Sequence, residues 1–215
     1  MDTTVVILMF NGMTALDAIG PYEVLSKMPG VRLCPVGREA GIIECAGGLR
    51  LAADGSIEQI DACEVLVLPG GPGIYRLLED EDLLQWIRRL SDHSGWTASV
   101  CTGSLLLGAA GILRGKKATT HWLHWERLRN YGAIPTKARY VIEDKIVTSA
   151  GVSAGIDMSL KLVQLLTNET AAQAVQLALE YDPDPPFNAG SPDTAPQQVV
   201  ELIRSATQRR EDTNR

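Results

Sequence analysis

Cys101 is the residue whose neighbours most clearly suggest chemistry. It lies in Ser99-Val100-Cys101-Thr102-Gly103, between a predicted strand, Thr97–Val100, and a predicted helix, Gly103–Leu113. This S-x-C-x-G pattern is the thiol counterpart of the G-x-S-x-G turn, whose small residues allow the backbone to turn sharply beneath a nucleophile. A helix N-terminus next to a thiol lowers its pKa and favours the thiolate. The pattern therefore predicts that Cys101 is a catalytic nucleophile.

The other three cysteines, Cys34, Cys45 and Cys63, lack such a context. No C-x-x-C pair occurs, and the histidines near them lack the spacing of metal ligands. We interpret these three as packing residues, since free cysteine is among the most buried residue types. The cysteines predict reduced thiols, a cytoplasmic location and no metal site.

A partner for the thiol has to be found among few candidates. The chain has only His93, His121 and His124, and Thr102 rather than histidine follows the nucleophile. A Cys–His–Glu triad of the amidotransferase kind is therefore poorly supported. His121 could reach the crevice as an accessory residue, although a capping or packing role explains its position equally well.

Asp17 is the better candidate for the proton transfers. It begins a predicted helix, Ala15–Lys27, directly after the predicted strand Thr4–Phe10, so it should lie at the carboxyl edge of the sheet. Apolar neighbours would desolvate its carboxyl group and raise the pKa towards that of a usable acid. By position alone, a charge stabilising a helix N-terminus is the alternative.

Backbone donors are expected near the nucleophile. Charge that develops during thiolate addition needs hydrogen-bond donors. Gly70-Gly71 follows the apolar predicted strand Val65–Leu68, so the N–H groups of Gly71 and Thr102 are candidates for this anion site. An ordinary glycine turn fits Gly70-Gly71 equally well.

These residues are positioned by alternating strands and helices. Apolar, β-branched runs such as Thr4–Phe10 and Val65–Leu68 are typical of buried parallel strands. Their alternation with amphipathic segments predicts an α/β fold: a flavodoxin-like sandwich with a mainly parallel central sheet and helices on both faces. Pro21 is expected to kink the helix Ala15–Lys27 or to start it.

One domain is expected to span residues 1–215. From about Asp182 the chain becomes rich in Pro, Asp, Ser and Gly, which predicts a Pro-rich C-terminal extension before a last short helix, Gln197–Thr207. The 215 residues carry 20 basic and 26 acidic side chains, a net charge of −6. This acidic balance argues against nucleic acid as a partner, and no apolar run is long enough to predict a membrane span.

Several segments resemble one known superfamily. Pro69-Gly70-Gly71, Ser99–Gly103, Ala118–Trp122 and Thr148–Asp157 are similar to the ThiJ/PfpI (class I glutamine amidotransferase-like) superfamily over about residues 4–167. Within it, the sequence around Asp17 (LDAIGPYEVL), the Cys101-Thr102 pair and the tail from Leu179 to Asp193 look like the isocyanide hydratase branch.

The resemblance implies a cofactor-free homodimer that adds water to an isocyanide and releases an N-substituted formamide. Cys101 would attack the terminal carbon to give a thioimidate, with Asp17 as general acid and base. Thr102 departs from the Cys-His pair of the protease-like branch, which argues against peptidase activity.

Two alternatives stay open at this point, because a fold does not determine a function. The first is a glyoxalase or deglycase acting through Cys101, the acidic residue and His121. The second is a binding or redox-sensing module in which Cys101 is oxidised. A fused DNA-binding pair of helical units is not expected, because only about thirty residues follow Tyr181.

Overall fold

A seven-stranded sheet forms the centre of the structure. The structure is a computed structural model that describes residues 3–213. The strand order is β10-β11-β7-β6-β1-β2-β5, and every neighbouring pair is parallel except the hairpin β10–β11. The strands are β1 (Thr3–Leu8), β2 (Val31–Gly37), β5 (Gly55–Ser56), β6 (Val65–Leu68), β7 (Trp96–Ser99), β10 (Tyr140–Glu143) and β11 (Ile146–Ser149).

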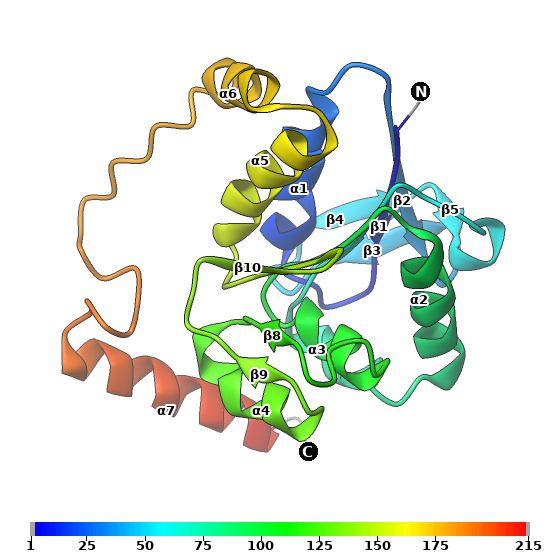
Figure 1. Cartoon of the computed structure of the whole chain (residues 1–215). Coiled ribbons are helices and arrows are strands. Elements are labelled where there is room, and N and C mark those ends of the chain that lie inside the picture. The colour runs from blue at the N-terminus through cyan, green and yellow to red at the C-terminus, as the bar shows by residue number, and fades with distance from the viewer. Residues whose placement is uncertain (1–2, 214–215) are drawn as a thin grey trace. The chain divides into compact units, whose positions relative to one another are not determined.

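Helices cover both faces of this sheet. Figure 1 shows α1 and α5 on one side and α3 on the other. The helices are α1 (Ala15–Ser26), α2 (Glu81–His93), α3 (Gly103–Ala109), α4 (Trp125–Asn130), α5 (Ala154–Leu166), α6 (Glu169–Ala178) and α7 (Gln197–Thr213). Short 3-10 turns occur at Ile57–Gln59, Pro72–Arg76 and Trp122–His124, and two small ribbons pair β3 (Gly41–Glu44) with β4 (Arg50–Ala53) and β8 (Lys117–Ala118) with β9 (Ile134–Pro135). The predicted α/β class is confirmed.

The strand order reverses between β1 and β6. From β1 the chain runs outward to β2 and β5 on one side, and then through β6, β7 and β11 on the other. Crossovers of opposite direction leave a crevice beyond the carboxyl ends of the two strands, which is where ligands bind in open α/β sheets. The topology therefore places the site next to β1 and β6.

The core explains why the central strands form. Val65–Leu68 is completely buried, as are Val5 and Val6 of β1. A strand covered by helices on both faces needs a continuous apolar run rather than an alternating one. Because of this requirement, these strands could be predicted from their continuous apolar runs in the sequence.

Pro21 does not start α1, one of the two positions predicted for it, but lies in the interior of the helix. Its missing N–H leaves the Asp17 carbonyl without the usual helical partner four residues on. The proline ring lies against α5: a Cβ atom placed on Gly155 would be 3.5 Å from Pro21 Cδ, an ordinary van der Waals distance.

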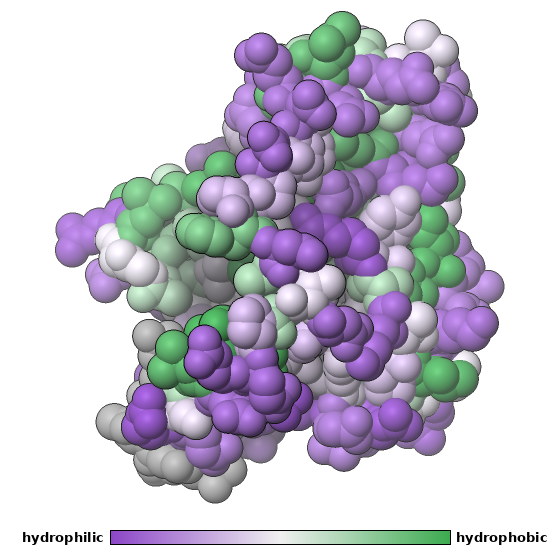
Figure 2. All heavy atoms as spheres, turned by 90° about the vertical axis from the view of Figure 1, so that its left-hand side faces the viewer, coloured by the Kyte–Doolittle hydropathy of each residue, from purple (hydrophilic) through white to green (hydrophobic). Residues whose placement is uncertain are grey.

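The chain divides into two compact units, Met1–Glu180 and Tyr181–Arg215. The large hydrophobic core cluster runs from Val5 to Val175 and so belongs to the first unit. The second unit contains the Pro-rich stretch and α7, which extends beyond the predicted Gln197–Thr207. Within residues 3–213, no helix is both long and apolar enough to cross a membrane. Hydrophilic side chains cover most of the face in Figure 2, with apolar ones gathered in smaller patches.

Candidate functional site

The residues that follow four neighbouring strands lie close together at one edge of the sheet. Asp17 follows β1, Gly70 follows β6, Cys101 follows β7, and Ala150 to Val152 follow β11. Because the carboxyl ends of parallel strands share one edge of the sheet, these residues meet at the crevice next to the topological switch point. The predicted pair of Cys101 and Asp17 is brought together here, since each side chain changes the pKa of the other.

Cys101 occupies a sharp turn with a left-handed backbone. Its φ is +56°, which costs on the order of 1–3 kcal/mol for a residue with a side chain. Its N–H donates to the carbonyl of Ala150 at 3.0 Å, and its own carbonyl accepts from Thr120 Oγ1 at 2.9 Å. A Cβ atom at Gly103 would lie 2.0 Å from the carbonyl oxygen of Leu68, so the turn needs glycine there. The sharp turn at Cys101 that the sequence predicted is thus present.

Asp17 is fully buried in the first turn of α1. Its Oδ2 accepts from the N–H of Gly70 at 2.9 Å, whereas Oδ1 has no hydrogen-bond partner among the described residues. Burial raises the pKa of Asp17 to about 7, against the opposing effects of the Gly70 N–H and the Cys101 side chain. The predicted rise of this pKa is confirmed, and Oδ1 is the oxygen free to take or give a proton.

The protonation of Cys101 differs from the sequence prediction. Burial raises the pKa of its thiol to about 12, and the charge of Asp17 adds to the rise. The N–H groups of Thr102 and Val152 and the Thr102 hydroxyl oppose it. The N–H of Thr102 at the start of α3 does lower this pKa, as the sequence predicted, but desolvation outweighs it and the net pKa is raised rather than lowered. Asp17 is the neighbouring group that can accept the thiol proton.

Thr102 links the nucleophile to the glycine turn. Its Oγ1 accepts from the N–H of Gly71 at 2.9 Å, while its hydroxyl and its N–H lower the pKa of Cys101. A Cβ atom on Gly70 would lie 2.5 Å from the Thr102 nitrogen, so the two turns touch through backbone atoms. The Gly71 N–H, predicted as a donor to the anion site, is thus taken by the Thr102 hydroxyl and acts on the sulfur only through that group.

The three histidines are occupied elsewhere. His121 packs against Gly151, and its Nδ1 accepts from the N–H of Leu123 at 3.4 Å, which is a capping contact. Nδ1 of His124 contacts the Tyr75 hydroxyl at 3.3 Å, and His93 contacts the Arg89 carbonyl within α2. Burial lowers the pKa of His121, which keeps its imidazole neutral. None of these contacts joins a histidine to Cys101 or Asp17 in the described part of the chain.

Val152 is a contributor that sequence reasoning did not identify. Its N–H faces the Cys101 thiol, and its φ of +35° is rare for a β-branched residue. Its sequence position after β11 gave no role, because the type of a residue does not indicate where its backbone N–H points. Among the described residues, no group of three His, Cys, Asp or Glu side chains is arranged to hold a metal ion.

The chain is similar to known proteins in sequence and in fold. A family model described as the DJ-1/PfpI family matches residues 3–165. An isonitrile hydratase of Pseudomonas putida is 45% identical over 197 residues, which cover 92% of this chain and 86% of that protein. A crystal structure of a ThiJ/PfpI family protein from Pseudomonas syringae superimposes with a TM-score of 0.94 at 36% identity, covering 97% of this chain and 87% of that one. A glutathione-independent glyoxalase, DJR-1.2 of Caenorhabditis elegans, is 24% identical over 70% of this chain and 81% of its own.

Proposed function

This chain belongs to the DJ-1/PfpI family, and on that premise we propose that it is an isocyanide hydratase, a hydro-lyase that converts R–N≡C and water into R–NH–CHO. The observation that carries the proposal is the pairing of Cys101 with Asp17 in a chain that is 45% identical, over 92% of its length, to an isonitrile hydratase. A buried thiol beside a carboxyl group with a pKa of about 7 suits a reaction that adds a proton and a nucleophile to the same carbon.

The first step forms a covalent intermediate. The Cys101 sulfur attacks the terminal carbon of the isocyanide while Asp17 Oδ1 accepts the thiol proton. Asp17 then delivers this proton to the same carbon, which gives the thioimidate R–N=CH–S–Cys101. The free Oδ1 and the Gly70 contact at Oδ2 fit this shuttle, because one oxygen is anchored while the other exchanges the proton.

The second step adds water. The Asp17 carboxylate removes a proton from water, whose oxygen attacks the thioimidate carbon, and Asp17 passes this proton to the nitrogen to give R–NH–CH(OH)–S–Cys101. Asp17 then takes the hydroxyl proton as the carbon–sulfur bond breaks, and it returns this proton to the thiolate while R–NH–CHO leaves. The donors that face the sulfur, the Thr102 hydroxyl and the N–H groups of Thr102 and Val152, stabilise the departing thiolate. The Gly71 N–H strengthens the Thr102 hydroxyl as a donor by polarising it.

The test is a steady-state assay of purified protein with a simple aryl isocyanide, in which ultraviolet absorbance follows the formamide. We expect turnover by the wild type and by Cys34→Ala, a cysteine of β2, and collapse in Cys101→Ala and Asp17→Asn. A silent wild-type protein contradicts the proposal, as does full activity in Cys101→Ala.

The glyoxalase alternative rests on the likeness to DJR-1.2. It would use Cys101 together with the acidic residue and His121. His121 makes a capping contact with Leu123 and packs against Gly151, next to Val152, while the mechanism described above assigns it no step. Methylglyoxal turnover without isocyanide turnover would favour this alternative. Absence of both, with ready oxidation of Cys101, would favour a redox sensor.

We also propose that the protein is a homodimer that works in the cytoplasm, as one α/β domain with a C-terminal extension. Leu16, Ile19 and Tyr22 project from one side of α1 and are 40%, 36% and 42% exposed. Large apolar side chains gathered on one face of a helix suit an interface between two copies. Four free cysteines suit a reducing compartment.

Sedimentation velocity tests the dimer. We expect a dimer for the wild type and a monomer for Ile19→Asp. The matched control is Ile42→Asp, which changes an even more exposed apolar residue on β3. A monomeric wild type, or a dimeric Ile19→Asp, removes this face as the interface.

A further inference from the structure

Val152 holds a strained backbone directly at the nucleophile. Its φ of +35° is disfavoured for a β-branched residue, and such strain persists only where the surroundings enforce it. The N–H of this residue faces the Cys101 sulfur. The strained backbone can direct this N–H at the sulfur only if another group holds Val152 in this conformation.

Arg139 contacts the chain on both sides of Val152. Before it, the Arg139 carbonyl accepts from the N–H of Ala150 at 3.0 Å. After it, Nη2 of Arg139 donates to Ser153 Oγ at 3.1 Å, and Nε pairs with Asp157 in the first turn of α5. Ser153 precedes α5 without using its own side chain as a cap, so its hydroxyl is free for this contact.

The same turn is fixed to the nucleophile. The carbonyl of Ala150 accepts from the N–H of Cys101 at 3.0 Å, so a single residue, Ala150, links Arg139 to Cys101 through its N–H and its carbonyl. The register of the hairpin makes this arrangement regular, since Tyr140 pairs with Ser149 and places Arg139 opposite Ala150. Arg139 is the residue that joins the edge strand β10, the turn and α5.

We propose that Arg139 is a positioning residue for the Cys101 sulfur: it clamps residues 150–153 so that the N–H of Val152 stays directed at the thiolate. The effect is geometric rather than a field effect, because the guanidinium is about half exposed and paired with Asp157, and the charged group that acts on Cys101 is Asp17. Only the turnover assay depends on the proposed function; the alkylation assay tests the role of Arg139 without it.

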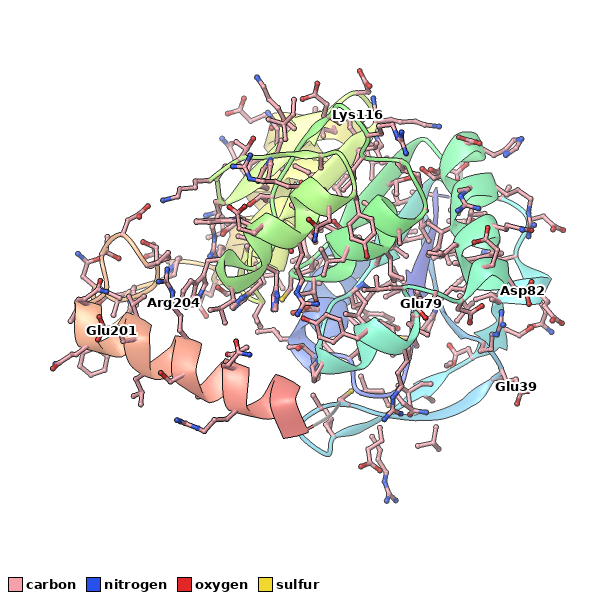
Figure 3. All side chains as sticks on the ribbon, turned by 90° about the horizontal axis from the view of Figure 1, so that it is seen from below. Glu39, Glu79, Asp82, Lys116, Glu201 and Arg204 are labelled. Carbon is pink, nitrogen blue, oxygen red and sulfur yellow. The ribbon has the colours of Figure 1, made fainter. Side chains whose placement is uncertain are left out.

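The experiment compares Arg139→Gln and Arg139→Lys with Lys116→Gln. Lys116 pairs with Asp144 in the β10–β11 turn, at the other end of the same hairpin, and Figure 3 shows it at the periphery. The control thus removes an ion pair of the same kind from the same hairpin without touching residues 150–153. Thermal unfolding should place all three variants within about 4 °C of the wild type, as expected for exposed ion pairs.

The first readout is alkylation of Cys101 by iodoacetamide, followed by mass spectrometry across a pH series. Loss of a donor to the thiolate raises the thiol pKa, so we expect Arg139→Gln to react roughly tenfold more slowly at a given pH, with its pH profile displaced upward. Arg139→Lys keeps the charge but cannot span both acceptors, so it should rescue only part of the rate. Lys116→Gln should follow the wild-type profile.

The second readout is isocyanide turnover. We expect kcat to fall roughly tenfold in Arg139→Gln while KM changes little, because the clamp acts on the nucleophile. An unchanged alkylation profile in Arg139→Gln overturns the proposal, and so does full rescue by lysine, which would indicate a field effect. If the wild type shows no turnover, the proposed function fails, while alkylation still decides the role of Arg139.

A milder variant covers the case in which Arg139→Gln does not fold. Ser153→Ala removes only the contact with Nη2 and leaves the pair with Asp157. A smaller displacement of the alkylation profile in the same direction supports the clamp. A wild-type profile in Ser153→Ala then overturns it.

Discussion

At the scale of single residues, the site is governed by where one proton resides. Burial raises the pKa of the Cys101 thiol to about 12 and the pKa of the Asp17 carboxyl group to about 7. The pair therefore starts the reaction as a thiol beside a carboxylate over most of the neutral and alkaline range. This order makes Asp17 the base for the first step and the acid that follows.

The pH profile of kcat/KM should show this ionisation. Because the carboxylate form of Asp17 is the active one, we expect kcat/KM for an aryl isocyanide to rise through a midpoint near pH 7 and then level off. Initial rates in buffers of constant ionic strength test this. A midpoint near pH 4, or a rise that continues towards pH 9, would show that another group controls the reaction.

Asp17 should also make the folded protein less stable as the pH rises. Its pKa is raised from an ordinary value of 3.8 to about 7, so the folded state binds this proton more tightly than the unfolded state. The resulting stability is complete below pH 3.8, is lost as the pH rises to 7, and amounts to roughly 4 kcal/mol at ~1.4 kcal/mol per pKa unit.

Urea unfolding of the wild type and Asp17→Asn at about pH 4.5 and pH 8 measures this effect. We expect the variant to gain stability relative to the wild type by several kcal/mol between the two pH values. Asparagine can still accept from the Gly70 N–H, so the comparison isolates the charge. An equal difference at both pH values would mean that burial of Asp17 costs nothing.

Residue types and strand ends were enough to predict Cys101 and Asp17 as partners. The acidity of the thiol was not predictable in this way. It depends on burial of the folded site and on Asp17, which raise the pKa, and on the N–H of Val152, which lowers it; these residues come from segments far from Cys101 in the sequence. The sequence around Cys101 contains only the helix N-terminus, whose effect is the weaker one.

At the scale of elements, the site depends on the close approach of two turns. The turn after β6 lies against the turn after β7, with Gly70 facing backbone and side-chain atoms of Thr102. The strands themselves were predictable because continuous apolar runs make buried parallel strands. The two-residue strands β5 and β9 were not predicted, since two residues carry no periodic pattern.

Gly70→Ala should disrupt both the fold and the activity. The added Cβ atom would lie 2.5 Å from the Thr102 nitrogen and 2.6 Å from its Oγ1, so the two turns must separate. We expect the free energy of unfolding to fall by about 1–3 kcal/mol. We also expect kcat to fall by roughly tenfold or more, because the separation of the turns displaces Cys101. Gly47→Ala is the control, because nothing lies within 4 Å of its added Cβ. Equal behaviour of the two variants would contradict the packing argument.

At the scale of the whole molecule, the hydrophobic core is built from residues of the first unit. The core cluster ends at Val175, and none of the residues of Tyr181–Arg215 whose burial the structure describes belongs to it. The Pro-rich stretch was recognisable from the sequence because proline cannot continue a helix or a central strand. The start of the Pro-rich stretch could be predicted from composition. The residues that it packs against could not, because no local sequence pattern indicates tertiary contacts.

A chain ending at Glu180 should therefore fold. We expect far-ultraviolet circular dichroism typical of an α/β protein and a single cooperative thermal transition, because the whole core is retained. The full-length protein is the control, measured at the same concentration. A chain that stays unfolded, or that melts without cooperativity, would show that residues 181–215 are part of the folding unit.

The glycines beneath the nucleophile also limit which positions of this protein tolerate substitution in directed evolution. Any side chain at Gly103 or Gly70 meets backbone atoms within 2.5 Å. Saturation libraries at these two positions would return mostly misfolded proteins, whatever substrate is used for screening. New substrate preferences have to arise from side chains elsewhere around the crevice. An engineer could therefore vary specificity while the catalytic turn is inherited unchanged.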